Sequence, residues 1–165
     1  MLYLLDTCIY GVLVDKGHKE YTNVRKILDY AKKHGDKFVT TFIIANELDD
    51  MMKEHKDIVL PVYYATAQSM IEHLIGEKVK DVRNLAWRYI QELKIDDAEK
   101  VFPDAENYSW ACHAKIDAFV TINRRGVLSK HLQPRIKRIN EEAQVRYVEI
   151  TTPTEFLGFL ASRTP

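Results

Sequence analysis

The chain has 165 residues, 46% hydrophobic and 29% charged, which suffices for one core but not for two, so we expect a single domain over residues 1–165. Lys plus Arg and Asp plus Glu both number 24, and this balance gives no sign of a polyanionic partner. The two cysteines, Cys8 and Cys112, lie far apart without a CxxC pair, which excludes a disulfide framework and a structural zinc site and favours a reducing cytoplasm.

Four short apolar runs are typical of strands. The first, Leu2–Leu5, is continuous rather than alternating, which suits a strand covered on both faces in a parallel sheet. Because Asp6 ends this run after four residues, we expect no signal peptide. The other three predicted strands are residues 37–40, 118–121 and 146–150.

Helical patterns separate these strands. We predict helices over residues 21–33, stopped at His34-Gly35, and over residues 42–55, capped by Thr41. Proline and aspartate at 103–104 predict a helix to about Lys115, and Pro153 predicts one through Leu160. The alternation of strands and helices predicts an α/β fold, a three-layer α/β/α sandwich with a central parallel sheet.

Residues 61–75 and 79–93 are predicted as a helix pair broken near Gly76, inserted on one side of the domain around residues 58–95. The longest uncharged stretch, residues 58–71, falls short of the roughly 20 apolar residues that span a bilayer. We therefore expect no membrane partner.

Three carboxylates have positions that suggest a site. Asp6 follows the first strand at its carboxyl end, where ligands bind in open α/β sheets, although Asp6 or Thr7 capping a helix from Cys8 is an equal alternative. Glu47 falls in the apolar stripe of its helix, where an unpaired charge is unfavourable; a salt bridge or contact with water is the simpler explanation. Asp104 is a typical helix N-cap, a role compatible with metal binding.

Polar residues also flank the strand at 118–121. Thr121 and Asn123 fall at its carboxyl end, and Asp117 precedes it. Taken alone, Asn123 is more typical of a turn than of a ligand, and Asp117 of a turn that enters a strand.

The segment from residue 124 to residue 146 carries a local charge of about +5. It adjoins Asn123 and is well placed to hold phosphates, with a solvated surface as the alternative. Its seven basic residues are Arg124, Arg125, Lys130, Arg135, Lys137, Arg138 and Arg146, and its two acidic residues are Glu141 and Glu142.

Taken in order, these segments resemble the PIN domain, a family of compact α/β/α nucleases. Asn123 stands where many members have a fourth aspartate, which lowers the negative charge of the site and puts one of two cations in doubt; Asp97, Glu106 and Asp117 are the candidates for a replacement acid. The resemblance covers nearly the whole chain, with residues 56–100 the least typical. The motifs that carry it are Leu4-Leu5-Asp6-Thr7, Phe42-Ile43-Ile44-Ala45-Asn46-Glu47-Leu48, Asp104-Ala105 with the helix that follows, and Val120-Thr121-Ile122-Asn123.

The resemblance implies a ribonuclease that cleaves single-stranded RNA. Its oxygen-only ligands select hard cations, so Mg²⁺ or Mn²⁺ is the expected cofactor. The implied catalytic residues are Asp6, Glu47, Asp104 and Asn123, and the implied metal ligands are Asp6, Glu47, Asp104 and Asp117. The predicted substrate-binding residues are Thr7, Thr121, Arg124, Arg125 and Lys130.

Several alternatives stay open. One is a VapC-type toxin with an antitoxin-type protein partner; another is a catalytically weak scaffold that binds RNA or a protein, and a homodimer fits either. A haloacid dehalogenase needs a second aspartate where Cys8 stands and is discounted. Some aromatic side chains are candidates for base stacking or for the core: Tyr10, Tyr63, Tyr64, Trp87, Tyr89, Tyr108 and Trp110.

Overall fold

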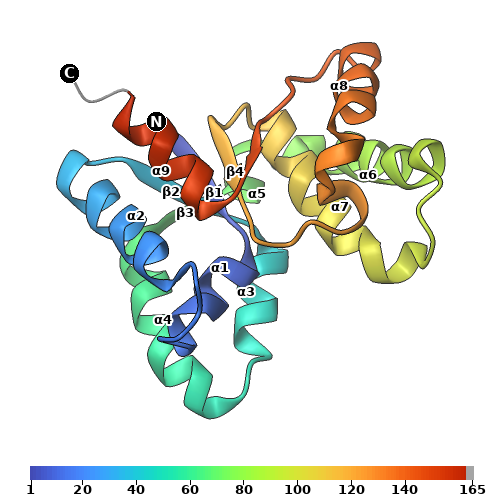
Figure 1. The fold of residues 1–165 in the computed structure, drawn as a ribbon. Helices are drawn as coiled ribbons and strands as arrows, with labels where there is room; N and C mark the ends of the chain where they lie inside the picture. Colours follow the sequence, from blue (N-terminus) through green and yellow to red (C-terminus); the bar gives the residue numbers. More distant parts are fainter. Residues whose placement is uncertain (163–165) are drawn as a thin grey trace.

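The computed structural model describes residues 1–162 and has a parallel sheet with helices on both faces (Figure 1). Within these residues the five strands form one all-parallel sheet in the order β3-β2-β1-β4-β5, which confirms the predicted fold class. The strands are β1 (Leu2–Leu5), β2 (Lys37–Thr40), β3 (Ala67–Met70), β4 (Ala118–Val120) and β5 (Ile150–Thr151). The α-helices are α1 (Thr7–Gly11), α2 (Tyr21–His34), α3 (Phe42–Asp49), α4 (Lys53–Thr66), α5 (Ile71–Ile75), α6 (Val79–Leu93), α7 (Ala98–His113), α8 (Gln133–Glu142) and α9 (Pro153–Ala161). Short 3-10 helices lie at Val12–Val14, Gly76–Lys78, Gly126–Leu128 and Lys130–Leu132.

Side chains of the neighbouring strands β1 and β4 contact the helical layers on opposite faces of the sheet. Tyr3 is paired in register with Phe38 of β2, and its ring packs edge-on against Phe156 of α9 at 4.8 Å between centroids. On the opposite face, Phe119 of β4 packs against Tyr108 of α7 at 5.7 Å. Figure 1 shows α6, α7 and α8 gathered on one side of the sheet, and α2 and α4 on the other. The result is the three-layer arrangement.

Several predicted boundaries are confirmed. Helix α2 ends at His34 and is capped by Gly35, whose φ of 68° is the left-handed conformation that glycine adopts readily at a helix end. Thr41 caps α3 by accepting the Ile44 N–H, and Thr152 caps α9 in a reciprocal pair with Glu155. The β1 and β2 boundaries also match the apolar runs in the sequence.

The predicted inserted helix pair is wrong in its first half. Where one helix was predicted over residues 61–75, α4 runs from Lys53 to Thr66, edge strand β3 forms beside β2, and the short helix α5 follows. The separately predicted helix over residues 42–55 is also too long, because α3 ends at Asp49. Residues 67–70 contain no β-branched or aromatic side chain, so their sequence does not predict a strand; pairing with β2 determines it. The second half, residues 79–93, is helical as predicted.

The predicted start of the next helix is also wrong. Helix α7 begins at Ala98, so Pro103 and Asp104 lie inside it. Proline there removes the hydrogen bond that residue 103 would donate to the carbonyl of Glu99, and tertiary packing tolerates that loss. The last predicted strand, residues 146–150, is largely wrong, because β5 comprises only Ile150 and Thr151. In the part of the chain described here, no helix has the length and apolar character that crossing a bilayer requires.

Candidate active site

The site lies at the carboxyl edge of the sheet. All strands run the same way, so the residues that follow them meet at one edge, where α/β proteins bind ligands. Asp6 follows β1 and Thr121 follows the neighbouring strand β4. Glu47 comes from α3, which follows β2, and Asp104 comes from α7, which precedes β4. Four separate elements therefore supply these side chains.

Asp6 is only 4% exposed and is held by three donors. Its Oδ1 accepts the backbone N–H of Thr7 at 2.8 Å, which makes Asp6 the N-cap of α1. Its Oδ2 accepts the Thr121 hydroxyl at 2.6 Å and the Cys8 thiol at 3.2 Å. Burial raises the pKa of Asp6, while these hydrogen bonds oppose that shift. Asp6 is thus both a helix cap and part of the carboxylate group.

Glu47 reaches the same edge through Thr7, whose hydroxyl donates to Glu47 Oε2. Burial raises the pKa of Glu47, and the negative charge of Asp6 raises it further. Within residues 1–162 Glu47 forms no salt bridge, so an ion pair does not explain its place in the apolar stripe. Glu47 is only partly buried, so the remaining explanations are contact with water, protonation or a bound cation.

Asp104 is not a helix cap, because it lies inside α7. Its Oδ2 accepts the Asn123 side-chain amide at 2.9 Å. Burial, then the negative charges of Asp6 and Glu47, raise the pKa of Asp104 to about 7, and the Asn123 hydrogen bond opposes that shift. The three carboxylates are therefore close enough to influence one another's ionisation.

These carboxylates do not form a closed metal cage. Among residues 1–162, no three His, Cys, Asp or Glu side chains are placed so that they could hold a metal ion directly. Glu47 Oε1 and Asp104 Oδ1 nevertheless accept no hydrogen bond from the described residues, so each carboxylate keeps a free oxygen. Mg²⁺ usually retains several waters and binds one or two carboxylates. The donors fit a hydrated hard cation of that kind.

Asn123 connects the carboxylate group to the loop that follows β4. Its backbone N–H donates to the Thr121 hydroxyl at 2.9 Å, and its Oδ1 accepts the Arg125 N–H at 3.1 Å. In this structure the hydroxyls of Thr7 and Thr121 donate to Glu47 and Asp6, so both threonines orient carboxylates. Their predicted contact with substrate stays a prediction.

The acids considered as replacements for a fourth aspartate lie elsewhere. Asp117 precedes β4 at the opposite, amino edge of the sheet, where it accepts the Leu2 N–H at 2.9 Å and lies 3.7 Å from Arg146. The prediction that Asp117 is a metal ligand with the other three is therefore wrong. Glu106 lies 3.8 Å from Arg83, and Asp97 is the N-cap residue of α7.

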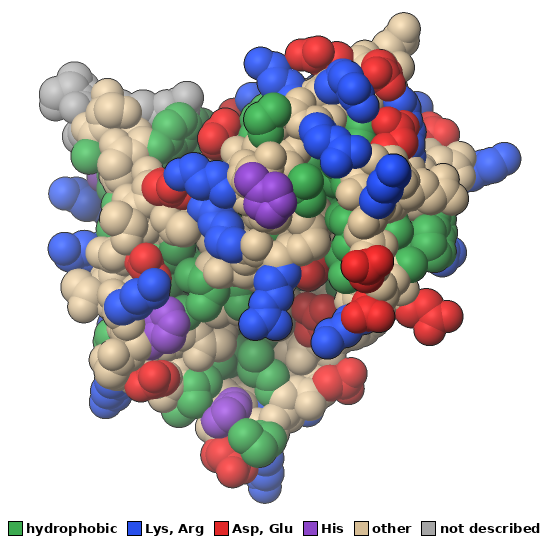
Figure 2. All heavy atoms as spheres, turned by 45° about the vertical axis from the view of Figure 1, so that its right-hand side comes forward, with side chains coloured by type: hydrophobic (Ala, Val, Ile, Leu, Met, Phe, Trp, Pro, Cys, Tyr) green, Lys and Arg blue, Asp and Glu red, His purple; other side chains and the backbone are tan. Residues whose placement is uncertain are grey.

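The basic segment does not form a one-signed surface, because acidic side chains from inside and outside the segment pair with it. Glu155 binds Arg124 at 2.7 Å and Lys130 at 3.2 Å. Other pairs are Arg138 with Glu92 and Glu142, and Arg146 with Asp117. On the face shown in Figure 2, Lys and Arg side chains are interspersed with Asp and Glu. Within residues 1–162, Arg125 and Lys137 are exposed and form no ion pair.

Two residues of the site were missed by sequence reasoning. Asn107, 1% exposed, accepts the Thr41 hydroxyl at 2.5 Å and lies on α7 three residues after Asp104. Cys8 contacts Asp6 and lies 3.2 Å from the Thr121 hydroxyl; burial and the charge of Asp6 raise the pKa of its thiol to about 12. The sequence signal for Asn107 was a polar residue on an otherwise buried face of its helix. The signal for Cys8 was its position two residues after Asp6.

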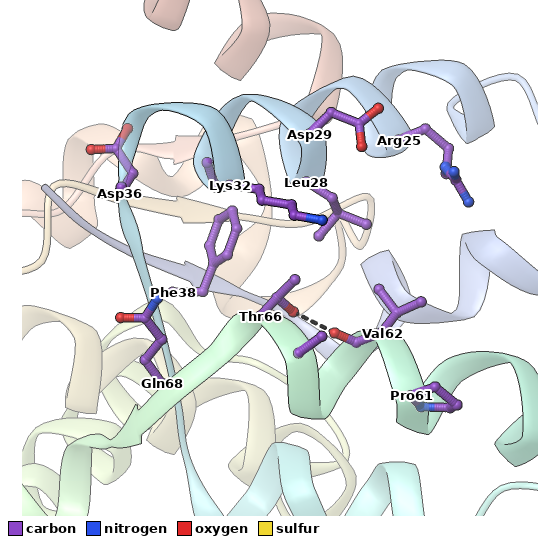
Figure 3. A pocket seen from close by; sticks show the side chains of 13 residues that line it. Arg25, Leu28, Asp29, Lys32, Asp36, Phe38, Pro61, Val62, Thr66 and Gln68 are labelled. Carbon is purple, nitrogen blue, oxygen red and sulfur yellow. Dashed lines mark hydrogen bonds between the residues drawn. The ribbon is translucent and has the colours of Figure 1, made fainter.

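A separate cavity of about 470 Å³ opens between α2 and α4. Figure 3 shows Arg25, Asp29 and Lys32 along α2 facing apolar side chains such as Phe38 and Val62. None of the carboxylates at the sheet edge lines this cavity. It is thus distinct from the candidate active site.

Comparisons with known proteins address the fold. No protein-family model and no curated protein matches the chain. Among solved structures, a chain in the crystal structure of VapBC2 from Rickettsia felis, bound to a DNA fragment from their promoter, is similar with a TM-score of 0.55. The two are 18% identical, and the match covers 92% of this chain and 98% of that chain. At this identity the likeness shows the fold alone, and it supports a VapC-like architecture at a coarse level.

Proposed function

We propose that this protein is a Mg²⁺- or Mn²⁺-dependent ribonuclease that cleaves single-stranded RNA at the carboxyl edge of its sheet. The observation that carries the proposal is the interaction of three carboxylates from three elements: Asp6 and Glu47 both raise the pKa of Asp104. Asp6 is buried and the other two acids are partly buried, and unpaired negative charge in such surroundings is destabilising unless a cation compensates it. The coarse VapC-like fold is consistent with this function.

Each residue has a distinct part in the proposed mechanism. Glu47 and Asp104 offer the free oxygens that would hold the cation, and Asp6 adds negative charge from its buried position. Thr7, Thr121 and Asn123 hold the three carboxylates through hydrogen bonds. A bound Mg²⁺ or Mn²⁺ would supply activation of a water for attack on phosphorus and would neutralise charge on the leaving oxygen. Arg125, free of an acid partner among the described residues, is available to a flanking phosphate.

The experiment is an RNA cleavage assay with labelled single-stranded RNA, run with Mn²⁺, with Mg²⁺ and with excess chelator. We expect cleavage only with metal. Asp104→Asn should lower the rate by more than about a hundredfold, since even partners of metal ligands typically contribute 10–100-fold. Asp117→Asn is the matched control, because it removes the same charge at the opposite edge of the sheet and should keep activity.

Cleavage that persists in chelator contradicts the proposal. RNA binding without cleavage, in every metal, would instead favour the scaffold alternative.

An antitoxin-type partner is a second proposal, and it rests on the likeness to a chain of VapBC2. Co-expression with the protein encoded beside this chain, followed by size-exclusion chromatography, tests it. A stable complex in which RNA cleavage is suppressed is expected; separate elution of the two proteins would contradict it.

A further inference from the structure

An exposed tryptophan and a partly buried phenylalanine lie across helix α7 from the candidate site. Trp87 of α6 is 41% exposed, and its ring packs against Phe102 of α7 at 4.7 Å between centroids. The Arg83 guanidinium lies 5.7 Å from the centroid of the same Phe102 ring. The other tryptophan, Trp110, is buried, as are Tyr89 and Tyr108. Trp87, Phe102 and Arg83 are called the Trp87 platform below.

The platform is separated from the carboxylates by the width of one helix. Phe102 precedes Asp104 by two residues on α7, a step of roughly 200° around the axis and about 3 Å along it. The two side chains therefore emerge on opposite sides of α7, about 10–12 Å apart across the helix. Residues 101–104 are all partly exposed, so this stretch of α7 lies at the surface between them. A strand that crosses it can contact both.

The chemistry of the platform suits nucleobases and phosphates together. An exposed indole stacks on the face of any base, and an arginine beside it adds a cation for the backbone. Arg83 lies 3.8 Å from Glu106, but its side chain stays 60% exposed and accessible to solvent. Val79, Arg83 and Trp87 follow one another at intervals of four residues, so they form one exposed ridge on α6. A charge in the middle of that ridge disfavours a purely apolar protein contact.

We propose that the Trp87 platform stacks a base of single-stranded RNA that is bound across α7 to the carboxylate site. This inference rests on the proposed ribonuclease function for the identity of the ligand. The platform binds bases without reading their sequence, so it contributes affinity for unpaired RNA. A base-paired duplex hides the base faces and gains nothing from it.

The experiment measures RNA affinity in chelator, so that binding is separated from cleavage. Trp87→Leu should bind a short single-stranded RNA about fivefold to a hundredfold more weakly, the range for loss of one stacked base. Trp87→Phe should retain most of the affinity. Tyr64→Leu is the matched control, since Tyr64 is 72% exposed on α4 and outside the platform; it should bind as the unaltered protein does.

Two further readouts report on stacking itself. RNA should quench the emission of Trp87 and leave that of buried Trp110 unchanged, so the quenching disappears in Trp87→Leu. A strand without bases should bind the unaltered protein weakly, and Trp87→Leu should weaken it no further. Undiminished RNA affinity in Trp87→Leu, or no RNA binding by the unaltered protein, overturns the inference. If Trp87→Leu instead changes oligomeric state and leaves RNA affinity intact, the face is a protein interface and the inference is overturned. Metal-dependent cleavage by the same proteins tests the proposed function separately.

Discussion

Replacing Asp104 with asparagine tests whether the three carboxylates form one charged site or serve only structural roles such as helix capping. The change removes one of three interacting negative charges and keeps an oxygen that can accept the Asn123 amide hydrogen bond. Asp104 lies inside α7, so the change removes no helix cap. Asp6→Asn is less clean, because Asp6 caps α1 and its loss typically costs about 0.5–2 kcal/mol.

The size of the effect follows from the pKa of Asp104, which rises from 3.8 to about 7 in the folded protein. A difference of roughly 3 pH units corresponds to about 4 kcal/mol at most. Asp104 is partly exposed and the site can relax, so we expect on the order of 1–2 kcal/mol. Because the folded pKa is raised, the stability associated with protonated Asp104 is fully present below pH 3.8 and is lost as the pH rises through about 7.

The assay is unfolding without metal at several pH values, with and without added Mn²⁺. Near pH 8 the Asn variant should melt about 2–8 °C above the unaltered protein, and the gain should shrink toward pH 4. A saturating ligand stabilises by about 2.7 kcal/mol at a hundredfold excess over its Kd, and this response to Mn²⁺ should be smaller in the variant. A metal-free variant that is less stable at pH 8, with an undiminished response to Mn²⁺, would refute the shared site.

Two further predictions concern the segment after β4. Glu155→Gln should preserve the helix cap and remove the ion pairs to Arg124 and Lys130. RNA should then bind more tightly, and the slope of log Kd against log salt concentration should steepen by up to about 0.7 for each new phosphate contact. An unchanged salt slope in a binding titration would contradict this prediction. Gly126→Ala should destabilise the protein by more than about 1 kcal/mol in chemical unfolding, since the residue has φ +50° and a Cβ there would lie 2.6 Å from Val101 Cγ1. If that variant is as stable as the unaltered protein, the loop at residue 126 shifts enough to accommodate the added Cβ, and the prediction is wrong.

The sequence predicted those parts of the site that local pattern determines. An apolar run ended by an acid identifies Asp6, and a carboxylate in an apolar stripe identifies Glu47. Asp104 was identified for the wrong local reason, as the start of a helix that in fact begins at Ala98. Pro103 misled because proline favours a first turn, while packing along α7 accepts it in the interior.

The parts that failed depend on contacts between distant residues. The charge of about +5 counted along the segment from residue 124 could not reveal Glu155 as a partner, because the contact forms only when α9 packs beside β5. Asp117 was grouped with the site because it adjoins the right strand, but the direction of that strand places it at the other edge. The local sequence pattern identifies candidate residues, but the direction of each strand determines which of them lie at the same edge of the sheet.

Asn123 departs from the PIN-domain pattern and forms two hydrogen bonds at the candidate site. A fourth aspartate at this position would place another carboxylate within about 3 Å of Asp104, whose pKa is already raised by two neighbours. The amide instead donates to Asp104 and accepts from the Arg125 backbone, contacts that a carboxylate could not make in full. Lower negative charge reduces repulsion without metal and also weakens the attraction for a second cation. For the proposed ribonuclease, the amide at position 123 therefore favours one hydrated cation over two, and its hydrogen bond would orient the Asp104 carboxylate toward that cation.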